Sequence, residues 1–450
     1  MTQNKTARLF ASKKFDLWDI YRERSLITLI TFDNNKIDKI STGIDEGTGL
    51  RVIKNNKTLF GFTNSLEKEY EIARSFVEDS SEKEINLSFI KPNIIHPVKI
   101  PPDNININEK INLLKKINDL ARSEDNRIKQ VTITYSEKIQ DIEIINDTGL
   151  IINDKRTYTS LIVFIVGSAD GKIETAHSVI SGLCGYEIID DKLIEKKVKD
   201  TVRIVVQLLE TDKKIMGEMP VIISSEAGGT MIHEAVGHSL EADQVEKGLS
   251  IYTRDMVGKK VASDIVTVYD DPTLPNRRGS YSFDDEGVKA VKKVLIENGI
   301  LSDFIYDREN ALKHKVKSNG GGRRESYRYR PIPRMSNTYV ASGKGNPEDL
   351  IKDTQKGLFV KKMGGGQVNT VTGEFIFDVK EGYMIENGKI TYPVRDATLL
   401  GKGSDVLNSI NAICSDIGFD VGTCGKDGQG VPVSDGLPTI RISKFLVGSK

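Results

Sequence analysis

The chain has 450 residues, of which 38% are hydrophobic and 28% are charged, a composition typical of folded globular proteins and unlike that of disordered or fibrous chains. Its 64 basic and 64 acidic residues cancel, so no overall charge directs the chain to nucleic acid or to an anionic membrane. The apolar runs are too short to span a bilayer, the N-terminus is too polar for a signal peptide, and the length predicts more than one domain.

The first 80 residues combine strand and helix patterns. Residues 25–31 are rich in β-branched side chains, which favours a strand. Two short apolar segments flank Asn55 and Asn56, and because asparagine tolerates positive φ, we expect a hairpin turn there. Apolar residues at helical spacing follow and predict a helix. Residues 80–106 are polar and contain four prolines, which predicts a linker.

The middle of the chain also mixes the two patterns. Residues 109–122 repeat apolar positions at i, i+3, i+4 and i+7, which predicts an amphipathic helix. Residues 130–189 have a β-like pattern, and a second long helix is expected over residues 192–209. From about residue 219 the chain is rich in glycine and has frequent turn signals between short strands, which favours a barrel or sandwich.

These patterns predict an α+β protein. We expect an N-terminal α/β domain over residues 1–80 and a middle α/β region over residues 107–212, with mixed sheets and amphipathic helices. We expect residues 219–450 to form a mainly antiparallel β domain, similar to a barrel or sandwich, that carries a metal-site helix.

The clearest chemical signal is a helix expected to start near Gly229. It carries His233, Glu234 and His238, and the chain has only five histidines in all. The two histidines are five residues apart, which places them about 140° apart on a regular helix, too far for one metal ion. A π-bulge would bring both rings to one side, and Gly237 is the natural place for it. The alternative is two helical histidines that are satisfied by ordinary hydrogen bonds.

A third ligand is expected from Cys424, which lies in a glycine-rich loop. Two histidines and one thiolate leave a fourth position open, the pattern of a catalytic zinc site. Cys184 and Cys414 fit small buried hydrophobes better. Glu234 directly follows a ligand and would act as general base on the attacking water.

Two acidic residues follow the second histidine, and their role has two possible interpretations. Glu241 and Asp243 could orient the imidazoles from behind. A solvated helix face explains them equally well.

The sequence HEAVGHSLEAD, from His233 to Asp243, resembles the signature of the TldD/PmbA family of metalloproteases, on the TldD side. Further matching segments cover most of residues 220–440, whereas the N-terminal half is similar to the family more loosely. The chain departs from the family at residues 318–322, where SNGGG replaces a Thr-Gly-Asn-Gly run. The matching segments are 270–280 (DDPTLPNRRGS), 284–287 (DDEG), 295–301 (LIENGIL), 322–326 (GRRES), 333–338 (PRMSNT), 364–368 (GGGQV) and 424–433 (CGKDGQGVPV).

The resemblance implies a zinc peptidase that acts on small, unfolded or modified peptides. It implies metal ligands at His233, His238 and Cys424, with Glu234 as the base. It also implies a dimer that encloses the site, either a homodimer or a heterodimer with a PmbA-like (TldE-type) subunit that lacks the metal motif.

We predict substrate contacts at Arg324, Arg334, Gly365 and Gly366. An arginine can bind a peptide carboxylate, and glycine-rich β edges can hold an extended peptide as an added strand.

Two other functions fit parts of the sequence. Arginines alternate with tyrosines over residues 323–334, as in a groove that stacks single-stranded nucleic acid. A non-catalytic, metal-stabilised scaffold would keep the ligands without needing Glu234. We expect neither nucleic acid nor membrane as a partner, because the chain is neutral. Three cysteines, an odd number, argue against disulfides and for the cytoplasm.

Overall fold

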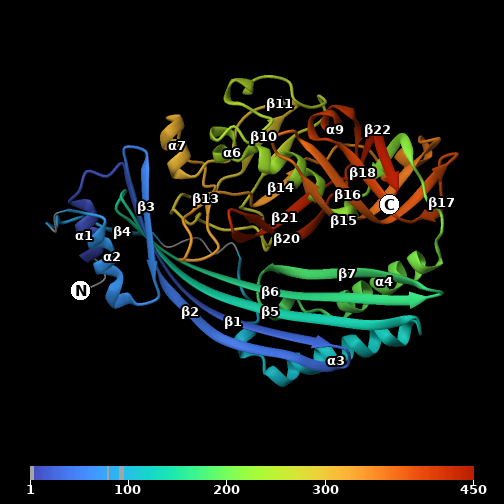
Figure 1. The fold of residues 1–450 in the computed structure, drawn as a ribbon, viewed down its shortest axis with the longest axis horizontal. Coiled ribbons are helices and arrows are strands. Elements are labelled where there is room, and N and C mark those ends of the chain that lie inside the picture. The colour runs from blue at the N-terminus through green and yellow to red at the C-terminus, as the bar shows by residue number, and fades with distance from the viewer. Residues whose placement is uncertain (1–4, 79–80, 91–95, 450) are drawn as a thin grey trace.

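The computed structural model describes residues 5–78, 81–90 and 96–449. A long, twisted sheet built from the first part of the chain lies beside a C-terminal part that contains a barrel and a second sheet (Figure 1). The predicted α+β class and the C-terminal barrel are both confirmed. No helix among the described residues is long and apolar enough to cross a bilayer.

The first sheet has seven strands in the order β3-β2-β1-β5-β6-β4, with β7 also paired to β6. Strand β4 pairs in parallel with β6, and the other pairings are antiparallel. Asn55 and Asn56 have φ of 52° and 61°, so the predicted hairpin is confirmed. The strands are β1 (Leu17–Asp33), β2 (Lys36–Lys54), β3 (Lys57–Thr63), β4 (Ser88–Ile90), β5 (Ile128–Asn146), β6 (Leu150–Ala169) and β7 (Lys172–Leu183).

Two long helices cover one face of this sheet, and both were predicted. They are α3 (Ile107–Glu124) and α4 (Asp191–Glu210). The side chains of Asn106 and Asp190 cap their N-termini, which satisfies backbone N–H groups that have no partner inside the helix. Their apolar faces pack against alternate residues of β5 and β6. Two shorter helices, α1 (Lys5–Ala11) and α2 (Glu69–Ser75), pack at the other end of the sheet.

The segment over residues 80–106, predicted as a linker or long connection, contains two short elements among its described residues. Its residues Ser88–Ile90 form β4, because a free edge of β6 offers them backbone hydrogen bonds. A 3-10 turn spans Pro102–Asn104. Of the four prolines in this segment, Pro92 lies outside the described residues. The division of the chain into three units stays a prediction, and strands from residues 1–80 and 107–212 share one sheet.

Five C-terminal strands close into a barrel in the order β15-β8-β22-β18-β16, with β16 paired back to β15. Strands β15 and β8 are parallel, and the other barrel pairings are antiparallel. The barrel strands are β8 (Gly217–Ile223), β15 (Lys356–Val368), β16 (Glu374–Glu386), β18 (Ala397–Lys402) and β22 (Ile440–Ser449), extended by β17 (Lys389–Val394) and β19 (Ile410–Ile413).

A second C-terminal sheet has the order β11-β10-β9-β14-β21-β20 and shares one core with the barrel. Its strands are β9 (Val268–Asp270), β10 (Lys293–Glu297), β11 (Ile300–Leu301), β14 (Asn337–Val340), β20 (Gly418–Lys426) and β21 (Gln429–Leu437). The remaining elements are the pair β12 (Gly322–Arg323) and β13 (Ile332–Pro333) and the helices α5 (Thr230–Ile232), α6 (Ala242–Glu246), α7 (Arg308–His314), α8 (Pro347–Lys352) and α9 (Gly403–Ser409).

A buried ion cluster joins the first sheet to the C-terminal part. Arg51 pairs with Asp19 and with Glu286, and Arg324 pairs with Asp19 at 2.9 Å. All four side chains are fully buried. Burial alone would raise the pKa of the Asp19 carboxyl, but Arg51 and Arg324 lower it below its ordinary value. Asp19 therefore stays ionised, and the cluster fixes the two parts against each other.

We expect Arg51→Met to destabilise the fold strongly, because it leaves Asp19 and Glu286 buried without their shared cation. Loss of one partner from a buried ion pair costs about 3–5 kcal/mol, which urea denaturation would measure. Arg24→Met is the control, since Arg24 and Glu46 form an exposed pair 3.6 Å apart and such pairs contribute about 1 kcal/mol or less. Equal losses in the two variants would contradict a stabilising role for the cluster.

Candidate metal centre

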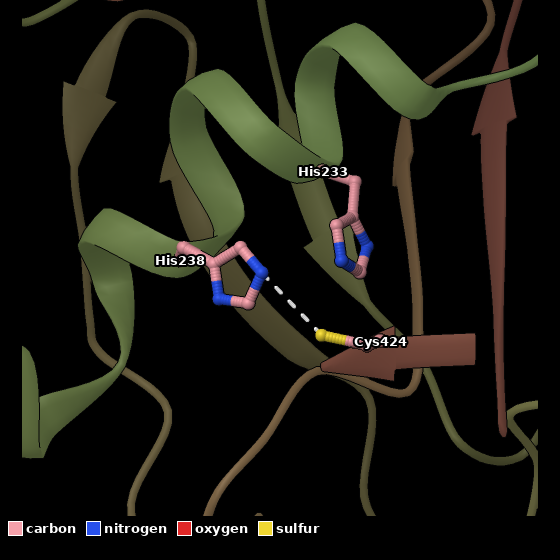
Figure 2. A group of neighbouring side chains, drawn as sticks. All are labelled: His233, His238 and Cys424. Carbon is pink, nitrogen blue, oxygen red and sulfur yellow. Dashed lines mark hydrogen bonds between the residues drawn. The ribbon is translucent and has the colours of Figure 1, made fainter. Parts of the chain in front are cut away.

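The helix that carries the two histidines is not regular. After β8 and a turn at Gly228, α5 spans Thr230–Ile232 and the chain then widens into a π-helical turn over His233–Gly237. A 3-10 turn over His238–Leu240 follows. The widening predicted from the five-residue spacing is therefore confirmed, and both imidazoles face the same side of the helix (Figure 2).

The third residue of the group comes from another element. Cys424 lies on the edge strand β20, where it pairs with Val431, and not in the loop expected from its neighbouring glycines; its sulfur points at the two rings (Figure 2). The distance from His238 Nε2 to Cys424 Sγ is 3.4 Å, and the nearest ligand atoms of all three residues lie within 4.8 Å of one another. The two rings stand nearly perpendicular, at 89°, with their centres 5.1 Å apart. The structure thus brings together the three residues that the sequence analysis predicted as ligands.

Two glycines allow the helix to approach its neighbours. A Cβ on Gly229 would lie 2.5 Å from the backbone nitrogen of Gly436, so the helix start packs directly on β21. A Cβ on Gly237 would lie 1.9 Å from Met335 Sδ. Glycine at these two positions therefore allows the helix to pack closely enough to bring its histidines next to β20 and β21.

A carboxylate supports each imidazole from behind. His233 Nδ1 lies 2.7 Å from Asp435 Oδ1, and His238 Nδ1 lies 3.0 Å from Glu241 Oε2. Each carboxylate accepts the Nδ1 proton and leaves Nε2 free to face the centre. Glu241 therefore has the supporting position considered above. Asp435, on β21, was missed by the sequence analysis.

Lys426 stands behind this support. Its Nζ donates to Glu241 Oε2 at 3.1 Å and to Asp243 Oδ1 at 2.6 Å. Asp243 is thus one step further from the histidines than Glu241, and it contacts the lysine rather than an imidazole.

The group is strongly polarised. Burial alone would raise the pKa of the Cys424 thiol, but the imidazoles of His233 and His238 lower it to about 5. Burial lowers the pKa of His238, but the Glu241 carboxylate and the Cys424 sulfur raise it to about 10. Burial raises the pKa of Glu241, but Lys426 and His238 lower it to about 2. The sulfur is therefore favoured as a thiolate, the form that binds metal.

Glu234 lies next to the group without joining it. Its Oε2 is 4.0 Å from His238 Nε2, and its side chain is 28% exposed. The carboxylate can therefore reach a small molecule at the centre and also solvent.

The residues present fit a zinc ion. Two imidazole nitrogens and one thiolate are donors that zinc prefers, and three protein ligands leave a tetrahedral position open. Both histidines already have the outer carboxylates that orient zinc-binding imidazoles.

Comparison with protein families identifies the chain. Models of the PmbA/TldA metallopeptidase match in three consecutive parts: domain 1 over residues 18–82, the central domain over 100–209 and the C-terminal domain over 216–449. The chain belongs to the PmbA/TldD metallopeptidase family. A TldD homologue of Buchnera aphidicola, named a metalloprotease, is 36% identical over 98% of this chain and 94% of its own length. A zinc metalloprotease TldD homologue of Saccharolobus solfataricus is 31% identical over 96% of each chain.

Solved structures share the fold of this metallopeptidase family member. TldE of Thermococcus kodakarensis superposes with a TM-score of 0.74 at 20% identity, covering 99% of each chain. A Thermotoga maritima protein named as a candidate modulator of DNA gyrase gives a TM-score of 0.80 at 22% identity over the whole of both chains. At these identities the likeness concerns the fold alone.

The arginines predicted to contact substrate have protein partners in this family member. Arg324 pairs with Asp19 in the buried ion cluster. Arg334 is fully buried and donates to the carbonyl groups of Cys424 and Gln429. Their substrate role stays a prediction, whereas the structure shows them holding the fold and the strand that carries Cys424.

The two predicted glycines differ from each other. A Cβ on Gly366 would lie 1.8 Å from Phe377 Cδ1, so packing alone requires glycine there. No atom lies within 4 Å of the Cβ position at Gly365, so this part of β15 is open to an approaching molecule. Substrate contact at both glycines stays a prediction.

The segment of alternating arginines and tyrosines does not form an open stacking groove. Arg323, Arg324, Tyr327 and Arg334 are all buried. Tyr327 donates to Asp45, and Arg323 donates to the carbonyl groups of Met335 and Pro432. Arg324 and Tyr327 therefore join the C-terminal part to the first sheet, Arg323 and Arg334 bond within the C-terminal part, and none of these four buried side chains is available to stack bases.

We expect Gly237→Ala to disturb the π turn, because a methyl group there overlaps the sulfur of Met335. Overpacking of this kind costs about 1–3 kcal/mol, measurable as a lower free energy of unfolding. Gly365→Ala is the matched control, since its Cβ position is open. If both variants unfold at the same denaturant concentration, the close packing at Gly237 does not constrain the helix.

Proposed function

We propose that this family member is a zinc-dependent peptidase that hydrolyses small, unfolded or modified peptides. The observation that carries the proposal is the convergence of His233, His238 and Cys424, with Glu234 beside them. The family models describe a metallopeptidase, and one relative is named a zinc metalloprotease, which supports the choice of reaction and metal.

Each residue has a role in this proposal. His233, His238 and Cys424 would hold the ion, and Asp435 and Glu241 would keep the two rings in place. When bound, zinc supplies a Lewis acid that activates water and polarises the scissile carbonyl. Glu234 takes a proton from the attacking water and returns it to the leaving amine.

An edge of β15 offers a place for the peptide. β8 pairs with β15 only over Leu358–Val360 and then turns away to form the metal helix. Among the described residues, β15 pairs on one side only, with β16, from Lys361 to Val368. An extended peptide could add to the free side through backbone hydrogen bonds, which give affinity with little sequence preference. Because β15 contacts the π turn, a peptide placed there lies close to the candidate metal centre.

We also propose a dimer and a cytoplasmic location. The dimer is either a homodimer or a heterodimer with a TldE-like subunit, and the shared fold with a solved TldE supports a partner of similar shape. The three cysteines are all free, and a reducing compartment keeps Cys424 available as a ligand.

The metal assignment predicts different effects for two buried cysteines. Cys424→Ser should weaken zinc binding by more than about 100-fold, since losing a residue that only orients a ligand already costs about 10- to 100-fold. Cys414→Ser, the control, alters a buried thiol outside the group and should keep full zinc. Elemental analysis of the purified variants measures both. Full zinc in the Cys424 variant would refute the assignment.

The role of Glu234 predicts a separation of binding from turnover. Glu234→Gln is nearly isosteric and leaves the three ligands intact, so it should keep its zinc and lose about 10²–10⁴ in rate, the typical contribution of a general base. Cleavage of a mixed peptide pool, followed by mass spectrometry, measures the rate, and zinc is measured in parallel. Wild-type turnover by the zinc-loaded variant would show that Glu234 is not the base.

The peptide-cleavage assay also tests the alternative that the protein is a non-catalytic, metal-stabilised scaffold. The zinc-loaded wild type is tested with and without a TldE-like subunit. If it cuts nothing in a broad pool under either condition, the scaffold becomes the better explanation of the metal centre.

A further inference from the structure

A cavity of about 300 Å³ lies between the first sheet and the barrel. Its walls come from α4, from β7 and from β15, and from the 3-10 turn Ser225–Ala227 that leads into the metal helix. Strand β7 is the strand of the long sheet nearest the barrel (Figure 1). The cavity is therefore distinct from the candidate metal centre but connected to it through the same turn.

The cavity is lined by more basic than acidic side chains, and most of the basic ones form ion pairs. Asp200 lies 3.2 Å from Lys196, and Glu381 lies 2.9 Å from Arg203 and 3.6 Å from Lys361. These two carboxylates are thus shared among three cations. The third lining carboxylate, Glu226, is exposed at the rim and forms no ion pair within the described residues.

Two lining lysines remain without a carboxylate partner among the residues that the structure describes. Within the described part of the chain, Lys362 donates only to the backbone oxygen of His177, at 2.7 Å, and Lys197 forms no ion pair within 4.0 Å. Burial, together with the like charge of Lys197, lowers the pKa of Lys362, although the carboxylates of Asp420, Glu381 and Asp200 act on it in the opposite direction. Two ammonium groups that repel each other in a half-buried cavity favour the arrival of an anion.

The cavity continues the free edge of β15. Lys361 and Lys362 line it, and they are also the first residues beyond the pairing with β8, which ends at Val360. A peptide that adds to this edge therefore has one end in the cavity. Asp420 also acts on Lys362, and Glu226 lies at the rim. A singly charged group consequently suits the site better than a dianion.

We propose that this cavity binds a carboxylate of the substrate peptide through Lys362 and Lys197. The carboxylate is either the free C-terminus or an acidic side chain near that end. This inference rests on the proposed peptidase function and gives it a substrate class. It also moves carboxylate recognition away from Arg324 and Arg334, whose side chains already have partners inside the protein.

The test measures binding without cleavage, using the full zinc-loaded chain with Glu234→Gln. Fluorescence anisotropy compares labelled peptides of one sequence in three forms: with a free C-terminus, with a C-terminal amide, and with an amide plus one glutamate near the end. A charge-assisted contact predicts about tenfold tighter binding of the form that carries the recognised carboxylate. The form that binds tightly identifies the source of the carboxylate.

Added to this background, Lys362→Met and Lys197→Met should each abolish the preference and leave the affinity for the plain amide unchanged. Lys192→Met is the control, because Lys192 is an exposed residue of the same helix as Lys197 and lies outside the cavity. Lys362→Gln replaces Lys362→Met if thermal denaturation shows that the methionine variant is unfolded.

Equal binding of all three peptides, or an unchanged preference in both lysine variants, would overturn the proposal. The experiments distinguish failure of the proposed peptidase function from failure of the proposed carboxylate site. If the wild type cuts charged and neutral peptides alike, the peptidase function stands and the cavity assignment falls. If the wild type cuts nothing but the preference depends on the lysines, the cavity assignment stands without catalysis.

Discussion

Two imidazoles five residues apart face one sulfur atom because the helix between them widens into a π turn, in which the backbone hydrogen bond from His238 N–H to the His233 carbonyl spans five residues instead of four. This π turn constrains the structure around it, since its backbone is packed on several sides. Met335 fills the space over Gly237. On another side, Gly403 packs so closely that a Cβ added to it would lie 2.7 Å from the carbonyl oxygen of Ala235. The barrel and the second sheet meet at this turn and share one core around it. The geometry of three side chains is thus set by the packing of a whole domain.

Charge balance is the second condition of the site. His233 and His238 each contact a buried carboxylate, and Lys426 neutralises the one that supports His238. A buried carboxylate without such partners would take up a proton and lose its hold on the ring. The support therefore comes from three separate elements, namely Lys426 on β20, Asp435 on β21 and Glu241 in the segment after the π turn.

The sequence predicted those features that depend on local spacing or local backbone conformation. The asparagine pair at 55–56, the amphipathic helices and the widened turn all follow from residues close in the chain. Cys424 is almost as far from the histidines but could be predicted because a cysteine between glycines is a recognisable metal ligand, whereas nothing in the sequence around Asp435 links this common acidic residue to His233, 202 residues away. The burial of Arg324 and Arg334 could not be predicted either, since arginine is mostly exposed in proteins and the partners of both residues, Asp19 for Arg324 and two backbone carbonyl groups for Arg334, are brought near only by folding. Strand β4 depends on an edge that the distant β6 supplies.

The position of β22 has a consequence for synthesis on the ribosome. Residues Ile440–Ser449 insert between β8 and β18, and β8 is the strand that leads into the metal helix. As far as the structure describes the chain, the last strand of the long first sheet ends at Leu183 and no strand of that sheet comes from the C-terminal part, so the sheet can form while translation continues. The barrel cannot close until those last strand residues emerge, and Cys424 also arrives late. The two histidines are therefore synthesised 186 residues or more before Cys424, and the group of three candidate ligands cannot form until that residue has been translated.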